Sequence, residues 1–136
     1  MAGLMKMDRA AVEADPAGVA TRAAETFGTI VVLKGARTYI ASPAGQLAVC
    51  VAGNVGLATS GSGDVLSGVI AGLAARRTEP FAAAAWGVFL HAKAGDRLAT
   101  KIGPLGYLAR ELLDEIPNLM WDIQAGHSPR PEPSGG

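Results

Sequence analysis

The chain has 136 residues, 49% of them hydrophobic and 18% charged, and this composition can bury the core of one globular domain. Twelve basic residues balance twelve acidic ones, so nucleic acid and membrane surfaces are not expected partners. No secretion signal is evident, and no stretch reaches the roughly 20 apolar residues of a membrane-spanning helix. The single cysteine, Cys50, cannot form an intramolecular disulfide, which favours a cytoplasmic protein.

The first part of the chain is predicted to be a helix followed by strands. After a short turn, an Ala-rich segment with apolar residues at helical spacing predicts a helix over residues 17–26, ended by Gly28. The β-branched run at residues 29–33 predicts a buried strand. Residues 38–41 and 46–51 flank a turn that contains Pro and Gly, so they predict a hairpin.

Three helices are predicted after the hairpin. Apolar residues recur at three- and four-residue spacing over residues 62–75. Pro80 suits a first helical turn, and the helix that it opens is expected to run towards Leu98. A third helix is expected over residues 105–116 and should stop at Pro117.

The end of the chain is rich in Pro and Gly and holds almost no apolar side chains. Such a segment cannot bury enough surface to offset the entropy of ordering. We therefore expect one domain over residues 1–121 and a disordered tail over residues 122–136.

The most informative motif is the glycine turn, which we define as residues 61–64: Gly61, Ser62, Gly63 and Asp64. It directly precedes a helix, so its backbone N–H groups can converge on an anion that the helix N-terminus also favours. The alternative is an ordinary helix-entry loop capped by Ser62 or Asp64. The motif has no Gly-Lys-Ser/Thr ending, which excludes a Walker A loop. Beside bound phosphates, the carboxylate of Asp64 can accept the proton of an attacking hydroxyl.

Several other polar and aromatic residues have simpler interpretations. His91 lies mid-helix with no evident acid or nucleophile as partner, so we expect a packed histidine. Asp96 and Arg97 are expected on a solvated face or as a capping pair. Trp86 and Phe89 are expected in the core or in a subunit contact.

One set of motifs covers residues 31–38 (Val-Val-Leu-Lys-Gly-Ala-Arg-Thr), 54–64, 65–73, 91–96 and 105–113. In these motifs the sequence resembles the ADP-dependent NAD(P)H-hydrate dehydratases. The resemblance implies an α/β, ribokinase-like three-layer fold, of which this chain would hold the carboxyl-terminal half: a strand, a hairpin, the glycine turn and packed helices.

The resemblance implies a lyase that repairs hydrated NADH or NADPH at the expense of ADP. The base would be Asp64, and the hydrate would be contacted by Asp64 and Asn54, although Asn54 can equally shape the loop. ADP or AMP would be bound by Lys34, Gly35, Ala36, Arg37, Thr38, Gly61, Ser62 and Gly63. No cluster has metal-ligand spacing, so Mg²⁺ is expected to arrive with the nucleotide.

The sequence also departs from the family pattern. Domains of that family are roughly twice as long, within a common range of about 50 to 250 residues. A segment resembling Pro-His-x-Gly-Glu, which would contact the hydrate, has no match here. These departures suggest a fragment, one part of a split gene or a degenerate copy, with weak ADP or AMP affinity and little activity alone. A second copy or a chain that supplies the amino-terminal half is then an expected partner.

Two alternatives stay open. One is a small-molecule kinase of the same superfamily, of the hydroxyethylthiazole or hydroxymethylpyrimidine type, since a Gly-x-Gly-Asp turn suits phosphoryl transfer in general. The Lys34 to Thr38 segment argues against it. The other is a non-catalytic nucleotide-binding or assembly subunit that pairs through its apolar helices.

Overall fold

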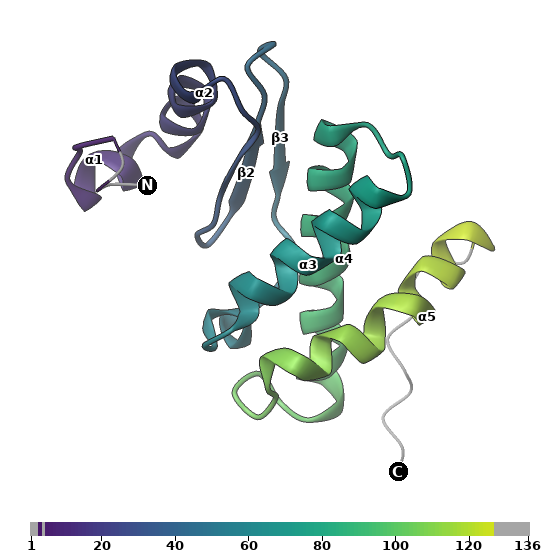
Figure 1. Ribbon diagram of the computed structural model, residues 1–136. Helices are drawn as coiled ribbons and strands as arrows, with labels where there is room; N and C mark the ends of the chain where they lie inside the picture. The colour runs from purple at the N-terminus through teal and green to yellow at the C-terminus, as the bar shows by residue number, and fades with distance from the viewer. Residues whose placement is uncertain (1–2, 4, 127–136) are drawn as a thin grey trace. The chain divides into compact units, whose positions relative to one another are not determined.

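Residue 3 and residues 5–126 are described by the computed structural model of the protein, which is drawn in Figure 1. The chain separates into two units. The first holds the residues up to Val51 together with Glu79–Ala85, and the second holds Ala52–Thr78 and the residues from Trp86 onward. Each unit has its own cluster of buried apolar side chains.

The first unit begins with two helices, where a turn and one helix were predicted. Helix α1 (Arg9–Ala14) starts at Asp8, whose side chain accepts a hydrogen bond of 2.7 Å from the amide of Ala11. Helix α2 (Pro16–Phe27) is capped by Asp15 in the same way. Helical structure is interrupted at Asp15, and Pro16 opens α2, because proline at the first helical position lacks only an N–H that would be unpaired there anyway.

Three short strands form an antiparallel sheet in the order β1 (Val31–Leu33), β2 (Thr38–Ala41) and β3 (Leu47–Cys50). The predicted hairpin is confirmed, with Ala41 opposite Leu47. The first strand is shorter than predicted, since the amide of Thr29 still donates to Ala24 at the end of α2.

Small residues let α2 approach this sheet. The buried cluster of the first unit contains mostly alanines, which bring the helix backbone close to the strands. Its members are Ala20, Ala23, Ala24, Val31 and Ala41. The predicted end of α2 is confirmed, because Gly28 adopts the left-handed conformation, with φ of 62°.

The second unit contains the glycine turn between two helical segments. A 3₁₀ helix, η1 (Val55–Ala58), precedes the turn, and helix α3 (Ser62–Ala75) has the predicted bounds. Helix α4 (Pro80–Lys101) starts at the predicted proline and runs three residues beyond Leu98. From Trp86 onward α4 belongs to this unit.

The last helix differs from its prediction. Instead of a helix over residues 105–116, the chain forms the 3₁₀ turn η2 (Ala109–Glu111) and then helix α5 (Leu112–Gln124), which contains Pro117. Proline removes one hydrogen bond of this helix, but Leu112 and Leu119 are fully buried in the unit's core. Packing thus outweighs the local preference. Residues 122–124 of the predicted tail belong to α5, and residues 127–136 lie outside the described residues.

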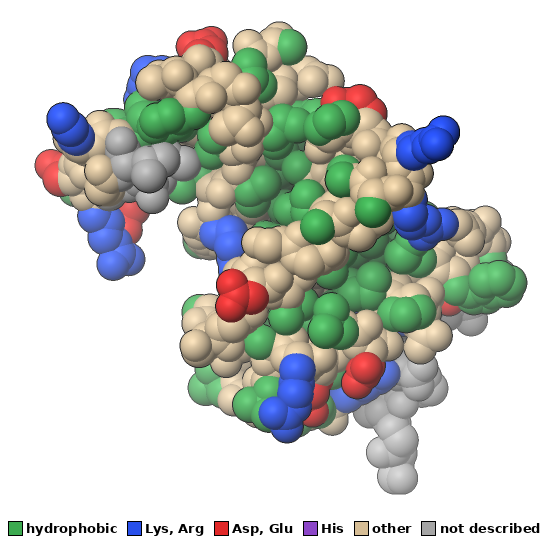
Figure 2. All heavy atoms as spheres, in the orientation of Figure 1, with side chains coloured by type: hydrophobic (Ala, Val, Ile, Leu, Met, Phe, Trp, Pro, Cys, Tyr) green, Lys and Arg blue, Asp and Glu red, His purple; other side chains and the backbone are tan. Residues whose placement is uncertain are grey.

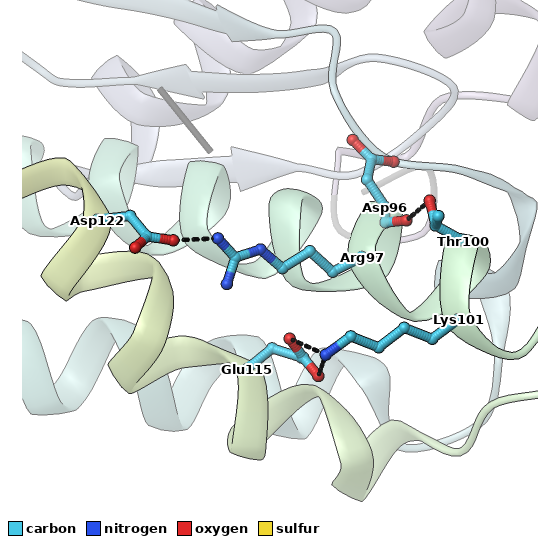
Figure 3. Close-up of polar contacts among 6 residues, drawn as sticks. All are labelled: Asp96, Arg97, Thr100, Lys101, Glu115 and Asp122. Atoms are coloured by element: carbon cyan, nitrogen blue, oxygen red, sulfur yellow. Dashed lines mark hydrogen bonds and ion pairs between the residues drawn. The ribbon is translucent and has the colours of Figure 1, made fainter. Parts of the chain in front are cut away.

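Helices α4 and α5 are joined by two ion pairs (Figure 3). Arg97 on α4 pairs with Asp122 on α5, and Lys101 Nζ lies 3.0 Å from Glu115 Oε1. The prediction of a solvated face or capping pair for Arg97 was therefore wrong, because its side chain is only 17% exposed and pairs with a residue 25 positions away.

Hydrophobic side chains also reach the surface of the second unit. Figure 2 shows them over α3 and α5, and the exposed ones include Leu113 and Trp121. Trp86 is half exposed and contacts Phe89 edge-to-face, with ring centroids 5.9 Å apart, so it does not lie in the core. Within the described part of the chain, no helix is both long enough and apolar enough to cross a membrane.

Candidate functional site

The glycine turn has the backbone geometry of an open helix N-terminus. Gly61 caps α3 with φ of 86°, a left-handed conformation that suits glycine, and its carbonyl accepts from the amide of Val65 at 3.1 Å. The amide of Ser62 donates to Thr59 at 3.3 Å. In helix geometry, the amides of Gly63 and Asp64 lack intrahelical partners and are available to an anion.

Asp64 lies in the first turn of α3, and its side chain is exposed. A Cβ added at Gly63 would meet nothing within 4 Å, so the surface beside Asp64 is open. Both residues are therefore accessible to solvent at the first turn of α3.

Ser62, in contrast, is buried. Its side chain is 2% exposed, and Oγ donates a hydrogen bond of 2.5 Å to the carbonyl of Leu57. Its own carbonyl lies 2.9 Å from Nε2 of His91, which is buried on α4. Because a carbonyl only accepts, Nε2 must carry the proton. The predicted packing of His91 is confirmed, and contact of Ser62 with a phosphate stays a prediction, since its hydroxyl is bonded to Leu57.

Asn54 lies at the centre of a hydrogen-bond network. Its Oδ1 accepts from the amide of Gly56 at 3.0 Å and from the hydroxyl of Tyr107 at 2.9 Å. Its Nδ2 donates to Asp96 Oδ1 at 3.2 Å, and Asp96 Oδ2 accepts from the amide of Gly53 at 3.3 Å. The side chain of Asn54 thus shapes the loop, and contact with a substrate stays a prediction.

Sequence reasoning missed Asp96 and Tyr107 as parts of this network. Asp96 was expected on a solvated face or in a capping pair, but its carboxylate binds a loop about 40 residues earlier in the chain. Tyr107 was assigned no role. Burial raises the pKa of Tyr107, while the hydrogen bond with Asn54 lowers it and the nearby charge of Asp96 raises it. The resemblance to the family over residues 91–96 and 105–113 was the one sequence signal that pointed to Asp96 and Tyr107.

Glycines allow close approach around the network. A Cβ at Gly95 would lie 2.7 Å from Leu57 Cδ2 and 3.0 Å from the hydroxyl of Tyr107. A Cβ at Gly56 would lie 2.6 Å from the same hydroxyl. Glycine is required at position 56, where a Cβ would also lie 2.2 Å from the carbonyl oxygen of Pro104, whereas a Cβ at position 95 would force the side chain of Leu57 to shift.

The predicted nucleotide-contacting segment of the first unit is the turn between β1 and β2. Lys34, Gly35, Ala36 and Arg37 are exposed, and Thr38 opens β2. Partial desolvation lowers the pKa of Lys34. A lysine amine at a turn can reach a phosphate as a mobile point charge.

The candidate residues are thus divided between the units. Asn54, Gly61, Ser62, Gly63 and Asp64 lie within the second unit, whereas Lys34 to Thr38 lie within the first. Among the described residues, no three His, Cys, Asp or Glu side chains come together as a possible metal site.

Comparison with known proteins gives one consistent family. Residues 2–118 match the family model described as NAD(P)H-hydrate dehydratase. The chain is 50% identical over 126 residues to an ADP-dependent (S)-NAD(P)H-hydrate dehydratase from Xanthomonas campestris pv. campestris, covering 93% of this chain and 44% of the relative. The chain therefore spans less than half the length of this curated relative.

Solved structures confirm the fold expected from the sequence. The ADP/ATP-dependent NAD(P)H-hydrate dehydratase from Bacillus subtilis, co-crystallised with ATP/Mg²⁺, superposes with a TM-score of 0.79 at 31% identity, covering 82% of this chain and 40% of that one. A ribokinase-like superfamily protein from Enterococcus faecalis gives a TM-score of 0.67 at 35% identity, covering 75% of this chain and 35% of that one. The fold is therefore part of a ribokinase-like α/β domain, and the chain belongs to the NAD(P)H-hydrate dehydratase family.

Proposed function

We propose that this chain carries the ADP-binding part of an ADP-dependent NAD(P)H-hydrate dehydratase. The observation that carries the proposal is the 50% identity with an enzyme of that name over nearly the whole chain. The glycine turn adds a chemical reason, because it combines an open helix N-terminus with an exposed carboxylate in the first helical turn. The proposed substrates are ADP and the hydrates of NADH and NADPH.

In the proposed reaction, the amides of Gly63 and Asp64 hold the β-phosphate of ADP. The carboxylate of Asp64 accepts the proton of the hydrate hydroxyl. The hydroxyl oxygen then bonds to the β-phosphorus as the bond from phosphorus to AMP breaks.

Dehydration follows from the new phosphate ester. The ring nitrogen donates electrons as the C–O bond breaks, phosphate departs, and loss of a proton from the neighbouring carbon restores NADH or NADPH. The protein's contribution is to position the two reactants and to stabilise charge on the transferred group.

We propose that Mg²⁺ is carried by the nucleotide. The co-crystallisation of the Bacillus subtilis enzyme with ATP/Mg²⁺ supports this for that protein.

We propose that the protein is cytoplasmic and forms a homo-oligomer, or a complex with a chain that completes the hydrate side. The half-exposed Trp86 and Leu113 and the largely exposed Trp121 support a contact surface. Size-exclusion chromatography with light scattering tests the assembly.

The first experiment is calorimetric titration of the folded chain with ADP and AMP. Weak saturable binding is expected, and folded protein that gives no binding heat with either nucleotide would overturn the proposal. The second experiment incubates the chain, alone and with a family member's polypeptide covering the hydrate side, with ADP and hydrated NADH. Inorganic phosphate, AMP and NADH should appear in equal amounts. A phosphorylated alcohol that keeps its phosphate would indicate the kinase instead.

A further inference from the structure

Helix α4 contacts the segment that leads into the glycine turn at three positions. His91 Nε2 lies 2.9 Å from the carbonyl of Ser62, and Asp96 accepts hydrogen bonds from Gly53 and Asn54. Between them, Gly95 leaves room for the side chain of Leu57. Helix α4 thus contacts both ends of the loop, which we define as residues 53–64.

Hydrogen bonds connect these contacts through the loop itself. The amide of Gly56 donates to Asn54, and the amide of Thr59 donates to the carbonyl of Gly56 at 3.2 Å. Leu57 accepts from the hydroxyl of Ser62. The positions of Asn54 and Ser62 are therefore coupled along the loop as well as through α4.

Tyr107 also belongs to the network. Its side chain is 4% exposed, and its hydroxyl donates to Asn54 Oδ1, which also accepts from Gly56. With Oδ1 shared by two donors and Nδ2 bound to Asp96, the rotamer of Asn54 is fixed. A fixed Asn54 in turn fixes the start of η1, which it caps.

We propose that His91, Asp96 and Tyr107 are positioning residues, which hold the loop so that the amides of Gly63 and Asp64 are arranged for a phosphate of ADP before the nucleotide binds. The ligand part of this inference rests on the proposed function. A turn ordered in advance loses less conformational entropy when it binds, and its donors need little rearrangement during phosphoryl transfer.

The test is amide hydrogen exchange of the full chain, combined with ADP titration. Tyr107→Phe keeps the buried ring and removes one hydrogen bond. The amides of Gly56, Ser62 and Val65 should then exchange about five- to tenfold faster, the change expected for one hydrogen bond. ADP affinity should fall by a similar factor. Amides in the middle of α5 should be unchanged, which separates local loosening from lower global stability.

His91 offers a pair of variants that separates its hydrogen bond from its bulk. His91→Gln can still donate from its side-chain amide to Ser62, whereas His91→Leu cannot. Exchange at Ser62 and Val65 should stay near the wild-type rate in the first variant and rise about five- to tenfold in the second. Equal exchange in both variants would overturn the role of His91.

Asp96→Ala should increase the exchange rates of the loop amides most. It removes both carboxylate oxygens that accept hydrogen bonds from Gly53 and Asn54. Asp114→Ala, at an exposed position of α5, is the matched control. Unchanged exchange at Gly53, Gly56 and Ser62 in Asp96→Ala would overturn the inference. If the wild-type chain binds no ADP, the proposed function fails, while the exchange data still decide whether these residues position the turn.

Discussion

Lys101 and Glu115 form an ion pair in which the two partners are buried to very different degrees. The side chain of Lys101 is 42% exposed, whereas that of Glu115 is 10% exposed, although Nζ lies 3.0 Å from Oε1 (Figure 3). If the pair is broken, water can solvate the lysine far better than the glutamate. The stability lost should therefore depend on which partner is removed.

We expect Lys101→Met to destabilise the protein more than Glu115→Gln. Removal of the lysine leaves a buried carboxylate unpaired, which should lower the free energy of unfolding by about 2 to 4 kcal/mol. Removal of the glutamate charge leaves a lysine that water can reach, and the loss should be about 1 kcal/mol. Urea unfolding of both variants measures the difference.

The exposed pair of Arg9 and Glu13 on α1 is the matched control. Glu13→Gln should leave the urea midpoint of unfolding nearly unchanged, because water screens an ion pair at the surface. Equal losses for Lys101→Met and Glu115→Gln would show that burial of Glu115 does not determine the strength of the pair.

Alanine substitutions at the two glycines of the turn should have opposite effects on stability. Gly61→Ala places a side chain at φ of 86° and should destabilise the protein by about 1 to 2 kcal/mol. Gly63→Ala meets no steric clash within the helix and should stabilise it by up to about 1 kcal/mol. Thermal unfolding checks both signs. A stabilising Gly61→Ala would contradict the described conformation of the turn.

Asp64→Asn should separate nucleotide binding from turnover. The amide side chain cannot accept a proton as a carboxylate does, so turnover by an active form should fall by about 10² to 10⁴. ADP affinity should change little, because the backbone donors remain. Phosphate release and calorimetry measure the two effects, with Asp114→Asn as the control. Undiminished turnover would exclude Asp64 as the base.

Glu79 should add a pH dependence to stability. Its carboxylate accepts from the amides of Phe81 and Ala82, each at 3.0 Å, and these hydrogen bonds lower the pKa of Glu79 in the folded protein. Its contribution is therefore present above the unfolded-state pKa and is lost as the pH falls through the folded-state pKa. Melting temperatures of the wild type and Glu79→Gln should converge in acid. A gap that stays constant with pH would contradict this role.

Local patterns predicted the parts of the fold that local chemistry determines. Glycines followed by apolar residues at helical spacing predicted α3 with its observed bounds, and the turn between residues 41 and 46 predicted the hairpin. The same reasoning failed at Pro117. Proline disfavours a helix locally, but the burial of Leu112 and Leu119 decides the structure, and burial depends on distant partners.

In the candidate site, too, local features could be predicted from the sequence and long-range contacts could not. Gly61 to Asp64 could be recognised because a helix N-terminus is encoded by neighbouring residues. The contacts of Asp96 and Tyr107 with Asn54 join residues 42 and 53 positions apart, and no local pattern contains them. Asp96 resembles any charged helical residue until the fold brings Asn54 to it.

The contacts of α4 with the loop also constrain the number of residues between His91 and Asp96. His91 and Asp96 lie five residues apart on one continuous helix, and each successive residue of an α-helix is rotated by about 100°. Inserting or deleting one residue between them would turn one of the two side chains away from its partner. This part of α4 can therefore tolerate substitutions at its solvent-facing positions but not a change in the number of residues.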